Sequence, residues 1–348
     1  MSKEAEHTAE ARKGSPLRRA LQLAIPLAIT VALVWYMFSK IDFAELWATI
    51  RHGVDYKWIL LAMGVSVFSH VFRALRWRLQ LRTLEVYPPL TALCCSIFGT
   101  YALNLVFPRL GEVWRCTYIS RREHASFTKV LGSMVADRLS DTLTVFTLLL
   151  LTMLLARDQI MLFLDRYPIG ASLAGLAASP RFWILLAGGL LLCGGLLRLL
   201  RDTKPVRALG RAAKEVWGGF AAISRMKGRG AFCLYTLAIW GCYFLQLYLA
   251  FFAFSCTREL TGESGTAWGL LPCLVAFVLS SIGMAVPSNG GLGPWNLCIV
   301  FGLGLYGVAY EPAASFSIVV WSAQTLTLVV LGIYTAIYTS RKQSPKTN

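Results

Sequence analysis

The chain has 348 residues, of which 56% are hydrophobic and 15% charged, and its mean hydropathy is +0.57. A soluble domain carries about 25% charged residues, so this composition excludes an ordinary soluble protein. The formal net charge of +16 does not indicate a nucleic-acid-binding protein either, because the basic residues cluster between apolar runs instead of covering one polar face.

Six apolar runs are long enough to cross a bilayer, which takes roughly 20 residues per helix. We expect an all-α, polytopic membrane protein, because a helix satisfies its own backbone polar groups in lipid. The chain would form a single domain over 18–340, between a disordered tail at 1–17 and a short polar tail at 341–348. The six predicted spans are about 20–38, 57–80, 127–156, 181–199, 231–254 and 313–339.

Two further apolar runs, 90–118 and 267–309, are each interrupted by Pro and Gly. Lys and Arg near span ends are retained in the cytoplasm, so their distribution predicts which side each connection occupies. Both termini are then cytoplasmic, at the inner membrane. The run 90–118 must enter and leave from the cytoplasmic side, and 267–309 from the opposite side, so both are predicted to be re-entrant hairpins. Of the 34 Lys and Arg residues, 26 lie in segments 1–19, 73–82, 109–129, 198–229 and 341–346.

These hairpins divide the chain into two halves, 57–156 and 231–339, each with a span, a hairpin and a second span. Because the hairpins enter from opposite faces, the halves form an inverted repeat. Segments 98–108 and 277–287 both begin with Phe and end with Pro. Broken segments at corresponding places in two halves indicate the central site of a transporter.

Residues 201–229 mix cations with apolar side chains at close to helical spacing. This pattern favours either a basic amphipathic helix on the cytoplasmic leaflet or an ordinary connecting helix.

A first group of candidate site residues lies at the cytoplasmic end of the second span, where Arg73 and Arg76 accompany Trp77. Guanidinium groups bind phosphate oxygens in a bidentate way. The alternative is that both arginines are anchors whose side chains extend to the membrane surface.

The most specific pattern lies at the turn of the inner hairpin, where Asn104, Arg109, Glu112 and Arg115 surround Pro-Arg-Leu-Gly at 108–111. Pro and Gly end one half-helix, and a new one can begin near residue 111 with its free backbone N–H groups toward an anion. Arg109 would add a formal charge. Glu112 could hold Arg115, since residues three apart share a helix face. The alternative is a cytoplasmic loop with a surface ion pair.

A third group, Asp137, Arg138 and Asp141, lies within the span 127–156. Ionisable groups inside a membrane span are energetically costly to bury in lipid, so they are candidates for a functional role. They could form a self-neutralising structural network, balance the phosphate-binding arginines of the hairpin, or carry a proton.

The turn of the outer hairpin contains Ser288, Asn289, Gly290 and Gly291. These residues offer backbone N–H groups to a substrate, and a plain glycine-rich turn is the alternative.

Taken in order, these motifs resemble the flippase-like transmembrane region of the lysylphosphatidylglycerol synthase family over roughly 20–340. The resemblance implies a membrane-embedded, lipid-handling domain, and in bifunctional members of the family this domain moves aminoacylated phosphatidylglycerol between leaflets. We expect no aminoacyl-transferase domain, because nothing soluble follows residue 340. The chain also has Asp137 where the family commonly has Glu before Arg.

We therefore expect a translocase and not an enzyme. Its partners would be membrane lipids with anionic phosphate or phosphoglycerol head groups. No cofactor or metal site is expected, and the absence of a G-x-x-x-x-G-K-[ST] loop leaves transport passive or driven by a gradient. One alternative is a membrane enzyme that acts on lipid phosphates. Another is a non-catalytic scaffold in envelope glycolipid assembly, and a homo-oligomer or a partner envelope enzyme also stays open.

Overall fold

The computed structural model describes residues 53–107, 109–159, 228–262 and 266–343, with a few isolated positions besides. Within these ranges the chain is helical apart from turns and one isolated β-bridge. In chain order the elements are α4 (Tyr56–Arg82), α5 (Leu90–Val106), α6 (Leu110–Arg122), α7 (Phe127–Leu155), α12 (Arg229–Phe251), α13 (Ser255–Gly262), α14 (Leu270–Gly283), the 3-10 turn η2 (Asn289–Gly291), α15 (Pro294–Gly304) and α16 (Tyr310–Gln343).

Four helices in the described ranges, α4, α7, α12 and α16, are long and apolar enough to cross a membrane. They confirm the expected all-helical, polytopic class, and they correspond to four of the six predicted spans. The other two, near 20–38 and 181–199, fall outside the described ranges, as do the tail 1–17 and nearly all of the segment 201–229.

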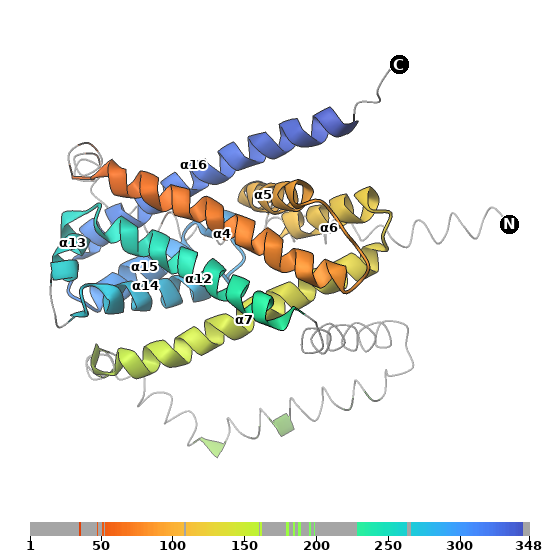
Figure 1. Ribbon diagram of the computed structural model, residues 1–348. Helices are drawn as coiled ribbons and strands as arrows, with labels where there is room; N and C mark the ends of the chain where they lie inside the picture. Colours follow the sequence, from red (N-terminus) through yellow and green to blue (C-terminus); the bar gives the residue numbers. More distant parts are fainter. Residues whose placement is uncertain are drawn as a thin grey trace.

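The first helices of the two predicted halves, α4 and α12, run antiparallel along one another (Figure 1). Where α4 begins, the backbone N–H of Asp55 donates to the carbonyl of Ala253, just past the end of α12, at 2.9 Å. Where α4 ends, Leu79 lies beside Gly228, which precedes α12. The α5–α6 pair lies toward the end of α4, and the α14–α15 pair lies toward its beginning (Figure 1).

In each short helix pair a glycine lies where the two helices approach closely. A Cβ on Gly111 of α6 would lie 2.1 Å from the carbonyl oxygen of Thr100 on α5. A Cβ on Gly302 of α15 would lie 2.8 Å from the Cα of Ala276 on α14. Small residues allow such close approach where lipid provides no hydrophobic driving force between helices. Both interrupted runs therefore fold as compact helix pairs.

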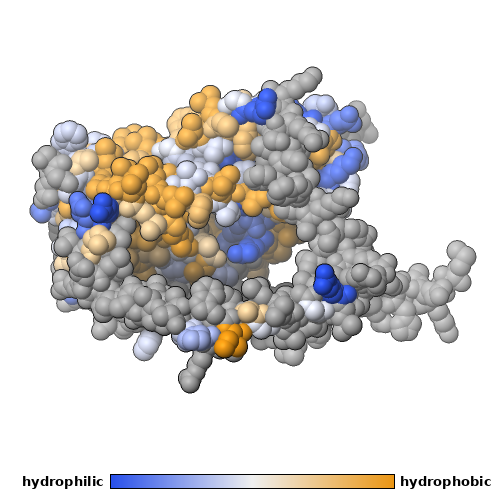
Figure 2. All heavy atoms as spheres, turned by 90° about the horizontal axis from the view of Figure 1, so that it is seen from below, coloured by the Kyte–Doolittle hydropathy of each residue, from blue (hydrophilic) through white to orange (hydrophobic). Residues whose placement is uncertain are grey.

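Two hydrophobic clusters support these pairs. The larger surrounds Phe251, Phe277 and Phe316 and joins α12, α14, α15 and α16. The smaller surrounds Trp77, Ile97 and Ile119 and joins α4, α5, α6 and α7. Trp77 of the smaller cluster lies against the buried guanidinium of Arg115. Figure 2 shows hydrophilic atoms recessed within a largely hydrophobic face of the molecule.

Candidate functional site

Two arginines of α4 and two aspartates of α7 form a buried network of ion pairs. Arg73 Nη1 lies 2.6 Å from Asp141 Oδ2. Arg76 spans both carboxylates, with Nε 2.9 Å from Asp137 Oδ1 and Nη2 2.7 Å from Asp141 Oδ1. Arg73, Arg76 and Asp137 are at most 2% exposed. The alternative that the arginines are surface anchors is therefore wrong, because their side chains turn inward to acids far away in the sequence.

Helical spacing explains why these four side chains meet. Arg73 and Arg76 are three residues apart, and Asp137 and Asp141 are four apart, so each pair projects from one face of its helix. The planar guanidinium of Arg76 has donors on two edges and can pair with both acids at once. Buried charges need such partners, because removing an ion from water costs several kcal/mol.

Arg115 of α6 approaches Asp137 from a third helix. Its guanidinium lies 4.4 Å from the centre of the Trp77 ring, and Nη2 is 3.6 Å from Asp137 Oδ2. Arg115 is fully buried, yet none of its nitrogens has a hydrogen-bonding oxygen among the described residues. Its neighbour Cys116 offers only a thiol, which is a weak acceptor. Arg115 is thus a buried cation with unused hydrogen-bond donors.

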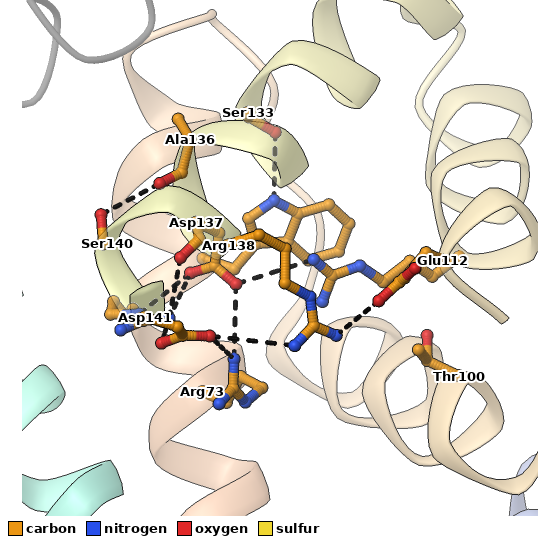
Figure 3. A network of polar contacts seen from close by, with 12 residues as sticks. Arg73, Thr100, Glu112, Ser133, Ala136, Asp137, Arg138, Ser140 and Asp141 are labelled. Carbon is orange, nitrogen blue, oxygen red and sulfur yellow. Dashed lines mark hydrogen bonds and ion pairs between the residues drawn. The ribbon is translucent and has the colours of Figure 1, made fainter. Parts of the chain in front are cut away.

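Arg138 forms the open edge of the network. It lies between Asp141 on its own helix and Glu112 on α6, as Figure 3 shows. The distance from Arg138 Nη2 to Glu112 Oε1 is 3.0 Å. Glu112 therefore pairs with Arg138, whereas the sequence predicted a pair with Arg115. The side chain of Arg138 is 32% exposed, that of Asp141 12% and that of Asp137 0%, so the network opens to its surroundings on the Arg138 side.

The charges of this network do not cancel. We refer to its seven residues as the charged cluster, which contains four arginines and three carboxylates and so carries one surplus positive charge. A surplus charge in a buried site favours an anion, because an uncompensated buried ion is strongly destabilising. The members of the cluster are Arg73, Arg76, Glu112, Arg115, Asp137, Arg138 and Asp141.

Polar residues of α12 and α5 complete the surroundings of the cluster, and sequence reasoning missed them. Tyr243 accepts a hydrogen bond from Arg73 Nη2 at 3.2 Å, and Thr236 accepts one from Arg76 Nη1 at 3.3 Å. Thr236 and Tyr243 are seven residues apart, or two helical turns, and so share one face. This spacing of two polar residues in an apolar span is the sequence pattern from which they could have been identified as site residues. The hydroxyl of Tyr101 on α5 lies 3.5 Å from that of Tyr243.

The turn between α5 and α6 differs from the anion site expected there. Asn104 accepts a hydrogen bond from the backbone N–H of Gly111 at 2.9 Å, so its side chain fixes the start of α6. Arg109 precedes α6 in a left-handed conformation (φ 64°) with an exposed side chain, and among the described residues no hydrogen bond or ion pair joins it to the charged cluster. Residue 108 lies outside the described ranges. The expected roles of Asn104 and Arg109 in a common phosphate site are therefore not supported by their placement.

The turn at 288–291 contacts the end of α5. Asn289 Nδ2 donates to the carbonyl of Val106, the last residue of α5, at 3.2 Å. The carbonyl of Gly290 accepts from Trp321 Nε1 of α16 at 2.9 Å. Gly290 and Gly291 both have positive φ, of 61° and 81°. The structure thus brings the turn containing Ser288 to α5 and α16.

Comparison with known proteins gives one match. The family model described as the lysylphosphatidylglycerol synthase TM region matches residues 23–332. No curated protein and no solved structure matches the chain.

Proposed function

The chain belongs to the family of the lysylphosphatidylglycerol synthase transmembrane region, as its motifs predicted, and from this premise we propose that it is a translocase for an anionic lipid. The lipid would be an anionic phospholipid or a polyprenyl-phosphate-type lipid. Its head group would enter the charged cluster from the Arg138 side, while its acyl chains stay in the bilayer.

One observation carries this proposal: Arg115 is a fully buried cation with unused donors in a cluster of surplus positive charge. Guanidinium groups bind phosphate oxygens through paired hydrogen bonds. The anion site therefore lies at Arg115, six residues or about 9 Å further along α6 than Arg109.

The acyl chains need an apolar path beside the head-group site, and α7 supplies one. Leu143, Phe146, Leu150 and Leu154 are each more than half exposed. By helical spacing they lie on the face of α7 roughly opposite Asp137 and Asp141, where the helix would face lipid. The acyl chains can therefore stay in the bilayer beside α7 while the head group occupies the charged cluster.

We propose further that the α5–α6 and α14–α15 pairs are re-entrant hairpins from opposite faces of the inner membrane, with both termini cytoplasmic. Mirrored packing supports an inverted repeat: α5 of the first half packs on α16 of the second, and α14 of the second packs on α7 of the first. Motion of one half against the other would expose the head group to each side in turn.

Reconstitution in liposomes tests the proposal. Lipids labelled on the head group are incorporated, and a membrane-impermeant quencher measures their exchange between leaflets. We expect exchange of an anionic phospholipid with the wild-type protein, loss of exchange with Arg115→Gln, and no loss with Arg121→Gln, which alters an exposed arginine of the same helix.

Two outcomes of this assay would contradict a translocase. Release of the labelled head group would indicate an enzyme that acts on lipid phosphates. Exchange no faster than in protein-free liposomes, for every anionic lipid tried, would favour a scaffold in envelope glycolipid assembly.

A further inference from the structure

We infer that the charged cluster accepts one singly charged phosphodiester and discriminates against head groups with two or more charges. This inference rests on the proposed function, because it assigns a substrate class to the same site. It follows from the surplus charge of the cluster and from the donors left over on Arg115.

Each acid of the cluster is already engaged by arginine. Asp137 contacts Arg73, Arg76 and Arg115, and Asp141 contacts Arg73, Arg76 and Arg138. Within the described ranges, Glu112 pairs with Arg138 alone. This pairing leaves the cluster itself with a single positive charge in excess. One bound monoanion would make the cluster neutral.

The unused donors are concentrated on one guanidinium. All three nitrogens of Arg115 are buried and lack a hydrogen-bonding oxygen in the described part of the chain. By contrast, Nη1 and Nη2 of Arg73 both donate hydrogen bonds, and Nη2 of Arg138 lies 3.0 Å from Glu112 Oε1. A phosphodiester shares its single charge between two non-bridging oxygens, and this geometry matches the two parallel donors of one guanidinium. One phosphodiester therefore satisfies both the donors and the charge.

A more highly charged head group fits less well. A phosphomonoester carries up to two charges near neutral pH, because its second pKa is about 6. A diphosphate carries more. Either would leave the cluster with an excess of negative charge, and an uncompensated buried charge is strongly destabilising.

Glu112 sets this charge balance most directly among the three acids. It is the acid with a single arginine partner among the described residues, and its side chain is 21% exposed at the open edge of the cluster. Replacing Glu112 with Gln keeps its shape and removes one negative charge, so the surplus becomes two positive charges. The preferred head group should then become a dianion.

Binding to the purified full-length protein in detergent at pH 8 tests the inference. The probes are dioctanoyl phosphatidylglycerol with one charge, dioctanoyl phosphatidic acid with about two, octanoate, and glycerophosphoglycerol, which has the phosphodiester but no acyl chains. We expect the wild type to bind phosphatidylglycerol at least ~10-fold more tightly than phosphatidic acid. Glu112→Gln should reverse this preference, and Arg121→Gln should leave it unchanged.

Arg115→Gln should weaken binding of phosphatidylglycerol ~10- to 100-fold, since hydrogen bonds to charged groups contribute about 1.5–3 kcal/mol. Arg115→Lys, which keeps the charge but loses the paired donors, should bind more weakly and retain the preference for one charge. Equal wild-type affinity for phosphatidic acid, or equal affinity for octanoate, would overturn the inference. So would a preference that Glu112→Gln does not change.

These outcomes are independent of leaflet exchange. Leaflet exchange without a charge preference in binding would support the translocase and contradict the inferred substrate class. Charge-selective binding without leaflet exchange would support the substrate class and contradict the translocase. Binding of glycerophosphoglycerol as tightly as the lipid would assign the site to a free phosphodiester and contradict lipid transport.

Discussion

Replacing Asp137 with Asn is the sharpest test of the charged cluster, because this fully buried acid is shared by three arginines. Its Oδ1 lies 2.7 Å from Arg76 Nη2, and its Oδ2 lies 3.6 Å from both Arg73 Nη1 and Arg115 Nη2. In the Asp137→Asn variant, the one remaining side-chain oxygen can still accept from Arg76. The new amide nitrogen would then face two guanidinium groups, and the surplus charge of the cluster would double.

The expected loss of stability follows from the cost of breaking a buried ion pair, which is about 3–5 kcal/mol. For a chain of this size such a change lowers the unfolding temperature by roughly 10 °C. Thermal unfolding of the purified protein in detergent measures it. The matched control is Asp158→Asn, which neutralises an exposed aspartate and should change stability by less than about 0.5 kcal/mol.

The double variant Asp137→Asn/Arg115→Gln separates charge balance from general damage. It restores a surplus of one positive charge, so it should be more stable than the sum of the two single changes predicts. Strict additivity, or a loss with Asp137→Asn no larger than with Asp158→Asn, would refute the reasoning from charge balance.

Two other predictions concern the hairpins. Gly111→Ala should abolish folding or shift α6, because its Cβ would overlap the carbonyl of Thr100. The control Gly132→Ala should be tolerated, because its Cβ would have no atom within 4 Å in the described part of the chain. The yields of monodisperse protein compare the two variants, and equal yields would contradict the close approach of α5 and α6. Cysteines replacing Leu105 and Gly290, in a background without the native cysteines, should form a disulfide, because a Cβ on Gly290 would lie 3.8 Å from the Cα of Leu105. Oxidation should then stop leaflet exchange and reduction should restore it, while exchange that continues in the oxidised protein would show that the two turns need not separate.

The sequence predicted the described helices well, because their apolar runs are long and their interruptions are marked by Pro and Gly. The span expected at 231–254 ends earlier, since α12 stops at Phe251 and the chain turns into α13. The backbone carbonyl of Ala253 in that turn pairs with Asp55, a contact over nearly 200 residues that local composition does not contain.

The site was predicted as separate groups whose partners could not be assigned. Arg73 and Asp141 are 68 residues apart, and only helix packing decides whether an arginine near a span end turns inward or toward the membrane surface. Glu112 and Arg115 have the spacing of a local pair, but Arg138 on α7 offers Glu112 a nearer partner. Arg109 was proposed from its place beside the turn, and a charge beside a turn does not determine where its side chain points.

The meeting of Asn289 with the end of α5 bears on how a membrane potential would act on this protein. In the proposed arrangement, the layer that separates the two aqueous sides is locally no thicker than this turn-to-helix contact. Most of the voltage would then drop across a few residues instead of the full width of the bilayer. A charged head group needs only a short displacement across such a layer to be driven by about 2.3 kcal/mol for each charge and each 100 mV.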